Sequence, residues 1–243
     1  MPVTRMLLIA CAMALAIARP CSAQQCGDVN DSGSVTVSDA LVVLQSAVGQ
    51  PVPLECPASG SPGRTGQSMC WNGGGEEINC NGTGQDGELR TGQPLSFTDN
   101  GNGTVTDNLT GLMWEKLSRN GTIHEVSDTF DWTNAFVKIS MLNDAKFAGH
   151  ADWRLPNQRE LFTLVTFGGA AEQTISAVFR DDCQPGCAVT TCSCTAADRY
   201  WSATTDPFLS GLAHGVDFGA ATTFSATKLS NRHVRAVRTA GGQ

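Results

Sequence analysis

A short segment near the start of the chain carries oxygen-bearing side chains at the spacing of a calcium-binding loop. Within Asp28–Asp39, side-chain oxygens fall at loop positions 1, 3, 5, 9 and 12, and Gly33 stands at position 6, where such a loop turns sharply. A hard cation takes roughly six to eight oxygen ligands, and Ser34 at position 7 adds its backbone carbonyl. The sequence predicts a Ca²⁺ site, and the alternative is an Asp-, Asn- and Gly-rich turn that binds no ion. The predicted metal ligands are Asp28, Asn30, Ser32, Ser34, Thr36 and Asp39.

The surroundings of this loop favour a weak site in a small module. Only Asp28 and Asp39 are carboxylates, so we expect a dissociation constant on the order of 10⁻⁴ to 10⁻³ M, the range of extracellular calcium modules. Apolar residues that share one face predict an exiting helix over about residues 38–48, which Gly49 and Pro51 end.

The run D-V-N-x-x-G-x-V-x-x-x-D-A-L, which starts at Asp28, resembles a type I dockerin repeat, an EF-hand-like element. Dockerins carry two such repeats and dock to cohesins of polysaccharide-degrading assemblies, whereas one repeat is found here. The resemblance implies bound calcium and a cohesin-like partner. Cys26 and Cys56 flank the segment, so a disulfide between them would close a module over residues 24–56, which is too small to fold without a staple or a metal.

The N-terminus predicts export. Residues 1–23 combine a basic start at Arg5, an apolar run and small residues before a cleavage point at Ala23, which together indicate a signal peptide. A membrane anchor and a lipoprotein signal are the alternatives. No apolar run of about 20 residues follows, so no transmembrane segment is expected after cleavage. We therefore expect a secreted or cell-surface bacterial protein.

Charge and cysteine content fit this location. Cleavage removes two Arg and no acid, which changes the net charge from −7 to −9 and argues against a nucleic-acid partner, because phosphate backbones demand excess Lys and Arg. The cysteines that remain are even in number, as expected for disulfides in an oxidising compartment. The disulfide candidates are Cys26, Cys56, Cys70, Cys80, Cys183, Cys187, Cys192 and Cys194.

Composition divides the rest of the chain into a connector and a large domain. Residues 57–67 are rich in Pro, Gly and Ser and predict a flexible linker. The large domain follows over residues 68–239. It begins with a loop that a Cys70–Cys80 bridge would close, where Trp71 is the aromatic residue expected at the surface.

The large domain shows both strand and helix patterns. Asn-Gly pairs within residues 99–107 predict a tight hairpin, although this oxygen-rich run could also be a second calcium loop. A helix is expected over residues 131–146, capped by Asp131 and with Trp132, Ala135, Phe136, Ile139 and Leu142 on one buried face. A second helix is expected after Pro156, with Leu161, Leu164 and Val165 facing inward. Strands are expected at 200–204, 213–218 and 233–238, so the pattern predicts an α+β domain.

These blocks also carry a family resemblance. The order F-T-D-N-G-N-G-T-V-T-D-N-L-T-G-L-M-W, D-W-R-L-P-N-x-R-E-L, Y-W-S-A-T, V-D-F and V-R-A-V-R resembles the C-terminal domain family of the Legionella collagen-like protein, Lcl. The W-R-L-P-N-x-R-E-L block and the V-R-A-V-R ending are also similar to the formylglycine-generating-enzyme and C-type-lectin-like fold. The resemblance implies a lectin-like α+β domain with long loops and a role in adhesion to sulfated glycans. Such ligands require a basic surface, for which Arg232, His233, Arg235 and Arg238 are the candidates.

Reactive residues do not form a recognisable catalytic set. No Cys follows Cys194, so the redox-active pair that formylglycine-generating enzymes carry near the domain end has no counterpart. The C-x₃-C…C-x-C run at 183–194 predicts two local disulfides, with a zinc site as the alternative. The His residues are widely spaced, and Glu160 is expected to pair with Arg154 or Arg159. We therefore expect no catalytic residues.

The sequence favours a secreted, non-catalytic binding or adhesion protein that recognises polysaccharide or a cell-surface glycan. The alternative is an accessory component of an extracellular polysaccharide-degrading system, recruited through the dockerin-like repeat. An enzyme of the formylglycine-generating class is a third possibility. The sequence does not identify the residues that would contact the glycan.

Overall fold

A computed structural model describes residues 63–168 and 174–241 of the chain. The chain divides into two compact units, Met1–Ser59 and Gly60–Gln243, and the elements below belong to the second. The predicted signal peptide, calcium loop, exiting helix and Cys26–Cys56 bridge lie outside the described residues. Within the described residues, no helix has both the length and the apolar character needed to cross a membrane.

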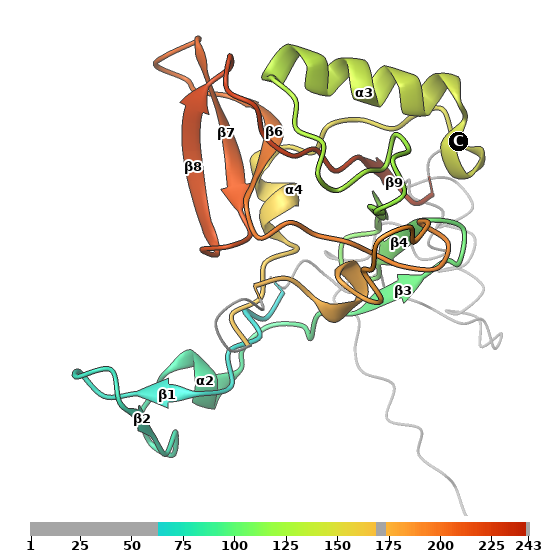
Figure 1. Ribbon diagram of the computed structural model, residues 1–243. Coiled ribbons are helices and arrows are strands. Elements are labelled where there is room, and N and C mark those ends of the chain that lie inside the picture. The colour runs from blue at the N-terminus through green and yellow to red at the C-terminus, as the bar shows by residue number, and fades with distance from the viewer. Residues whose placement is uncertain (1–62, 169–173, 242–243) are drawn as a thin grey trace, which may run out of the picture. The chain divides into compact units, whose positions relative to one another are not determined.

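Antiparallel pairs build three small sheets (Figure 1). The four-stranded sheet has the order β3-β4-β5-β9, from Phe97–Asp99, Thr104–Asp107, Leu112–Glu115 and Val237–Thr239. The three-stranded sheet has the order β6-β7-β8, from Arg199–Thr205, Leu212–Asp217 and Thr222–Thr227. The third pairs β1 (Cys70–Trp71) with β2 (Glu77–Ile78). The predicted hairpin at residues 99–107 is the β3–β4 connection, so this run is not a metal loop followed by a helix.

Within residues 63–168 and 174–241, three short α-helices and two 3₁₀ turns accompany the sheets. They are α2 (Asp86–Leu89), α3 (Trp132–Asp144), α4 (Gln158–Phe162), η1 (Phe147–Gly149) and η2 (Ala177–Phe179). The domain is therefore mixed and strand-rich with few helices, which agrees with the predicted α+β class. The Asp131 side chain accepts a hydrogen bond from the Asn134 backbone N–H at 2.8 Å, which confirms the predicted cap of α3.

Two apolar clusters form the interior. Trp114, Leu161 and Tyr200 belong to the cluster beneath the four-stranded sheet and α4, whereas Trp153 and Trp201 belong to the cluster under α3. The inward positions predicted after Pro156 are confirmed, because Leu161, Leu164 and Val165 are all buried.

Two sequence expectations about individual positions differ from the structure. Phe136 was expected on the buried face of α3 but is 40% exposed, because the segments that cover α3 reach only the stripe through Ala135, Ile139 and Leu142. The predicted strand over 233–238 forms ladder pairs only from Val237 onward, and before it only His233 makes a single bridge, to Tyr200.

The end of the predicted linker is part of the large domain. Residues 63–67 are tied by backbone bonds, since Arg64 N–H donates to Gln93 C=O at 2.8 Å and Phe167 N–H donates to Thr65 C=O at 2.7 Å. The predicted Cys70–Cys80 disulfide closes the β1–β2 loop. Trp71, expected at the surface, is half-buried.

Candidate functional site

The candidate site is a cleft beside α4, with a volume of about 410 Å³. Residues from three parts of the chain line it: the stretch that precedes the sheets, the β4–β5 turn, and α4 with the segment after it. We call it the α4 cleft. Its walls are mostly apolar, with a few polar groups at the rim, which is the usual make-up of a ligand site. The lining residues are Gly63, Arg64, Thr65, Leu95, Asp107, Leu109, Thr110, Arg159, Phe162, Thr163, Val165 and Phe167.

A network of charged hydrogen bonds fixes the start of α4. Asn157 and Glu160 form a capping box, in which each side chain accepts a bond from the backbone N–H of the other. Both terminal nitrogens of Arg154 donate hydrogen bonds to the Glu160 carboxylate, at 2.7 and 2.6 Å. Of the two arginines predicted as partners of Glu160, Arg154 is therefore confirmed. Because these bonds hold the first turn, Arg159 and Phe162, three residues apart, line the cleft together.

The β4–β5 turn supplies another part of the wall. Asp107 is buried, and its carboxylate accepts bonds from the Leu109 and Thr110 backbone N–H groups and from the Thr110 hydroxyl. These bonds use the Asp107 oxygens to shape the turn, as Asp commonly does. Asp107 therefore positions Leu109 and Thr110 and is not a free acid or base.

Two arginines bring positive charge to the cleft. Arg64 Nε donates to the Gly92 carbonyl at 2.9 Å, which leaves its two terminal nitrogens without a hydrogen-bond partner among the described residues. Arg159 is exposed, and its guanidinium makes no hydrogen bond to a described residue. Two phenylalanines line the same cleft, of which Phe162 is part-buried and Phe167 is exposed. The cleft can therefore offer apolar ring faces and planar hydrogen-bond donors to the same ligand.

A second group of charged residues is buried and lies apart from the α4 cleft. The Glu115 carboxylate contacts His124 Nδ1 at 2.8 Å and Lys138 Nζ at 3.1 Å, and it accepts the Ala236 backbone N–H at 2.9 Å. Burial alone would raise the pKa of Glu115, but the Lys138 charge, His124 and the Ala236 N–H outweigh it and lower that pKa to about 2. None of the three side chains lines the α4 cleft. The group joins β5, α3 and the segment before β9, so we assign it a structural role.

The four candidate residues at the end of the domain do not form a basic surface. Arg235 and Arg238 are completely or almost completely buried, and His233 is also buried. Arg235 donates to the carbonyls of Glu115 and Cys194, and Arg238 pairs with Asp152 at 2.7 Å. In a strand, neighbouring side chains point to opposite faces, so one face could have been exposed. Here the side chains on both faces of residues 233–238 are buried. Arg232 alone of the four is half-exposed, 5.9 Å from the Phe224 ring centre.

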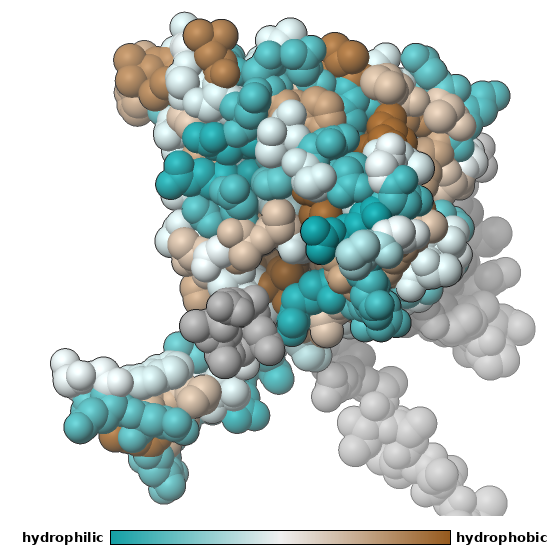
Figure 2. Space-filling view, in the orientation of Figure 1, coloured by the Kyte–Doolittle hydropathy of each residue, from teal (hydrophilic) through white to brown (hydrophobic). Residues whose placement is uncertain are grey.

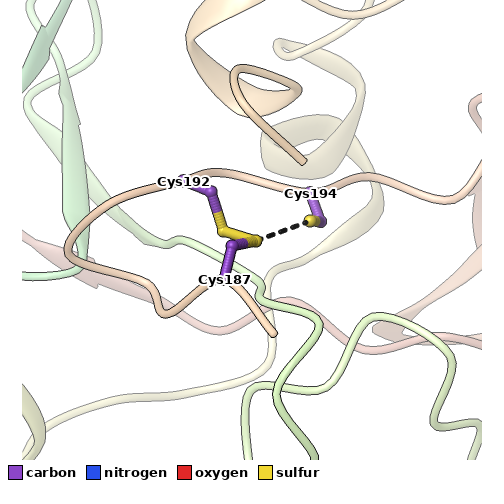
Figure 3. A group of neighbouring side chains, drawn as sticks. All are labelled: Cys187, Cys192 and Cys194. Atoms are coloured by element: carbon purple, nitrogen blue, oxygen red, sulfur yellow. Dashed lines mark hydrogen bonds between the residues drawn. A yellow bond between two sulfur atoms is a disulfide. The ribbon is translucent and has the colours of Figure 1, made fainter. Parts of the chain in front are cut away.

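The cysteine-rich insertion forms two disulfides, Cys183–Cys194 and Cys187–Cys192. The sulfurs of Cys187, Cys192 and Cys194 gather closely, with Cys187 Sγ 3.9 Å from Cys194 Sγ across the two bridges (Figure 3). Zinc binds thiolates, and all these sulfurs are already bonded in pairs. The structure therefore agrees with the local disulfides and not with the zinc alternative.

An exposed apolar tip lies at one end of the three-stranded sheet. Phe208 and Leu229 are 92% and 86% exposed, and Leu209 next to Phe208 is also exposed. The two loops meet because Lys228 N–H donates to the Gly211 carbonyl at 3.0 Å. Figure 2 shows hydrophobic surface at the corresponding upper left corner. This tip competes with the α4 cleft as a contact surface, and an experiment must separate the two.

Sequence reasoning did not find the α4 cleft. The predicted metal ligands lie outside the described residues, so the structure brings none of them to this site. The sequence indicates Arg159 only as a partner of Glu160, and it predicts a flexible linker around Arg64. The available signal was the strong capping pattern of N-x-R-E, which fixes a short helix and therefore the two positions that face the cleft.

Comparison with curated proteins finds no match. The family model of the Lcl C-terminal domain matches residues 103–238, more than half of the chain. The matched range contains α3, α4, the three-stranded sheet, the cysteine-rich insertion and the cleft residues from Asp107 to Phe167. The chain belongs to the Lcl C-terminal domain family.

Proposed function

We propose that this chain is a secreted, non-catalytic binding or adhesion protein that recognises polysaccharide or a cell-surface glycan in the α4 cleft. The observation that carries the proposal is the pairing of two phenylalanine rings with two arginines whose terminal nitrogens make no hydrogen bond to a described residue. A sugar ring has an apolar face that packs on an aromatic ring and an edge of oxygens that accept hydrogen bonds. The cleft offers complementary groups for both.

The proposal of binding without turnover rests on the acids of the cleft. Asp107 is the one carboxylate among the described lining residues, and its oxygens are bonded within the β4–β5 turn. Hydrolysis of a glycosidic bond generally uses two carboxyl groups, on opposite sides of the bond. The cleft therefore has the groups to hold a sugar and lacks a pair that would cleave it.

A glycan array probed with the mature protein tests the proposal. We expect binding that falls at least tenfold in the double variant Arg159→Ala plus Phe167→Ala, because both side chains are exposed and line the cleft. Arg180→Ala is the matched control, since Arg180 is also exposed and makes one side-chain bond to a backbone carbonyl. Binding that is unaffected by the double variant but lost in Phe208→Ser plus Leu229→Ser would move the site to the apolar tip.

We further propose that the N-terminal module binds calcium. Asp28, Asn30, Ser32, Thr36 and Asp39 supply side-chain oxygens and Ser34 a backbone carbonyl, a donor set that suits a hard cation. Calcium would order this module and supply no chemistry to the cleft. In calorimetry of the mature protein we expect weak, saturable calcium binding that Asp28→Ala plus Asp39→Ala abolishes. Binding retained in that variant would remove the assignment.

The dockerin-like repeat favours a second candidate function, an accessory role in an extracellular polysaccharide-degrading system. The D-V-N-x-x-G run supports it, although the second repeat of a dockerin is not found. A cohesin-binding assay separates the two functions. The accessory role predicts cohesin affinity that a chelator or Asp28→Ala abolishes, and no affinity would end it.

A further inference from the structure

The apolar tip gathers the most exposed hydrophobic side chains of the described residues. Phe208 and Leu209 lie in the loop between β6 and β7, and Leu229 lies in the loop after β8. Their exposed fractions, 92%, 59% and 86%, exceed that of every other large hydrophobic residue in 63–168 and 174–241. Both loops stand at the upper left end of the three-stranded sheet (Figure 1). Single exposed hydrophobic residues are common on proteins, but three at one tip indicate a contact surface.

Hydrogen bonds within the first loop already use the backbone groups of the tip. The Asp206 carboxylate accepts the Phe208 and Leu209 backbone N–H groups, both at 2.9 Å, so this acid is committed to the loop backbone. The Leu209 carbonyl accepts the Leu212 N–H at 2.8 Å. An apolar medium offers no hydrogen bonds, so a backbone group that enters it needs a partner within the protein. Phe208 and Leu209 meet this requirement before the tip contacts any surface.

A single cation stands at the base of the tip. Lys228 is the one charged residue within 207–211 and 228–231. Its Nζ lies 3.9 Å from the centre of the Trp132 ring and donates to the Thr205 hydroxyl at 3.0 Å. Because Thr205 ends β6 and Trp132 begins α3, these contacts hold the ammonium behind the loops. The phosphate groups of a bilayer likewise lie outside its apolar interior, so the tip and a bilayer surface are complementary in charge and in apolar character.

The size of the tip favours a lipid surface over a protein partner. A stable protein interface buries about 800 Å² on each side and involves roughly 20–30 residues of each partner. The tip offers three large side chains on two loops, which is far less. A bilayer requires no such area, because its mobile lipids enclose an inserted side chain and the binding strength grows with the apolar area buried.

We propose that the apolar tip inserts into the outer layer of a lipid bilayer and holds the protein reversibly at a membrane surface. Phe208, Leu209 and Leu229 enter the boundary between headgroups and acyl chains, and the Lys228 ammonium stays at the level of the phosphates. None of these residues lines the α4 cleft, so the inference does not depend on the glycan binding proposed there.

Sedimentation of the mature protein with phosphatidylcholine vesicles tests the tip. This zwitterionic lipid is the probe because anionic vesicles would repel an acidic chain. We expect saturable binding, with a partition coefficient that falls at least about tenfold in Phe208→Ser plus Leu229→Ser, which removes two of the inserted side chains. Leu89→Ser is the matched control and should leave the partition coefficient unchanged, since Leu89 is also exposed, at 57%, but lies on α2.

Insertion itself is read from Phe208→Trp, which keeps a large apolar ring at the tip. On addition of vesicles, the fluorescence that this variant gains over the unaltered protein should shift to shorter wavelength. Lipids brominated on their acyl chains should quench it. Leu89→Trp should show neither effect. All the replaced side chains are exposed, so each variant should keep the thermal unfolding midpoint of the unaltered protein, which separates lost binding from lost folding.

Three results would each overturn the proposal: no vesicle binding at millimolar lipid, equal partition coefficients for the tip double variant and Leu89→Ser, or no quenching in Phe208→Trp. Sedimentation without lipid addresses the other occupant of such a surface. Self-association of the unaltered protein that the tip double variant removes, together with no vesicle binding, would assign the tip to a second copy of the chain instead.

Discussion

At the scale of single residues, Glu115 joins three segments that are far apart in the sequence. It lies at the end of β5, Lys138 is on α3, and Ala236 directly precedes β9. Moving a carboxylate or an ammonium from water into the interior costs roughly several kcal/mol for each group. The attraction between the two charges offsets that cost only when both are present. The pair therefore contributes more to the uniqueness of the packing than to the net free energy of folding.

A double-mutant cycle tests this interpretation. Glu115→Gln leaves the Lys138 charge buried without its carboxylate, and we expect the free energy of unfolding to fall by about 3–5 kcal/mol. Lys138→Met should also destabilise, because the buried Glu115 carboxylate loses the ammonium that contacts it at 3.1 Å. The double variant should lose less than the sum of the two, as measured by urea unfolding.

A partly exposed pair serves as the control for that cycle. Arg199 contacts Asp217 at 3.2 Å, and the Arg199 side chain is 48% exposed, so Arg199→Gln should cost less than about 1 kcal/mol. Additive effects of Glu115→Gln and Lys138→Met, or losses no larger than that of Arg199→Gln, would show that the two buried charges do not depend on each other.

The pKa of Glu115 also predicts how stability changes in acid. The folded-state pKa, about 2, lies below the ordinary 4.5, so the unfolded chain takes up this proton first as pH falls. The stability that the carboxylate contributes is complete above pH 4.5 and is lost as pH falls from there through about 2. In Glu115→Gln, the slope of unfolding free energy against pH should be smaller in this window by about 1.4 kcal/mol per pH unit. Identical slopes in both proteins would contradict the assigned pKa.

Local rules predicted some single residues well and missed others. The Asp131 cap and the Arg154–Glu160 pair follow from residues a few positions apart, and both are present. The contacts that hold Arg235 and Arg238 in the interior come from segments 41 to 120 residues away, including the partner Asp152. No pattern within one strand contains that information, which is why alternation along the sequence does not reveal their burial.

At the scale of elements, the three-stranded sheet depends on a glycine between two rings. Gly215 of β7 pairs with Trp201 on one side and Phe224 on the other. The Trp201 and Phe224 ring centres are 5.8 Å apart. A Cβ at this position would press on the Tyr200 carbonyl and on the Phe224 ring. The close approach therefore needs a residue without a side chain.

Gly215→Ala should destabilise the domain by about 1–3 kcal/mol, because it forces atoms into a closed space. The thermal unfolding midpoint would report the loss. Gly211→Ala in the preceding turn is the matched control, since a Cβ there meets no atom within 4 Å. Equal midpoints for both variants would mean that the rings can move apart at little cost.

Elements with a buried face were easier to predict than those without one. The helix expected at 131–146 is observed as Trp132–Asp144, because its apolar stripe has a core to face. Strand β8 was not expected. Its residues alternate only between exposed and half-buried, so the sequence TTFSAT shows no apolar period. The pairing with β7 defines this strand, and pairing partners are not visible in a single segment.

At the scale of the whole molecule, the sequence predicted the family and the mixed architecture but not the place of binding. The ordered blocks that resemble the Lcl C-terminal domain correspond to the matched residues 103–238. The α4 cleft also uses Arg64, Thr65 and Leu95, which precede that range. A site assembled from segments this far apart is defined by tertiary structure alone.

The account is tested most directly by measuring binding and product formation together. An oligosaccharide selected on the array would be titrated into the mature protein by calorimetry, and its mass determined before and after long incubation. We predict saturable binding that Arg159→Ala plus Phe167→Ala reduces at least tenfold, and an oligosaccharide of unchanged mass. A product that accumulates and disappears when one side chain of residues 68–239 is replaced would contradict the account.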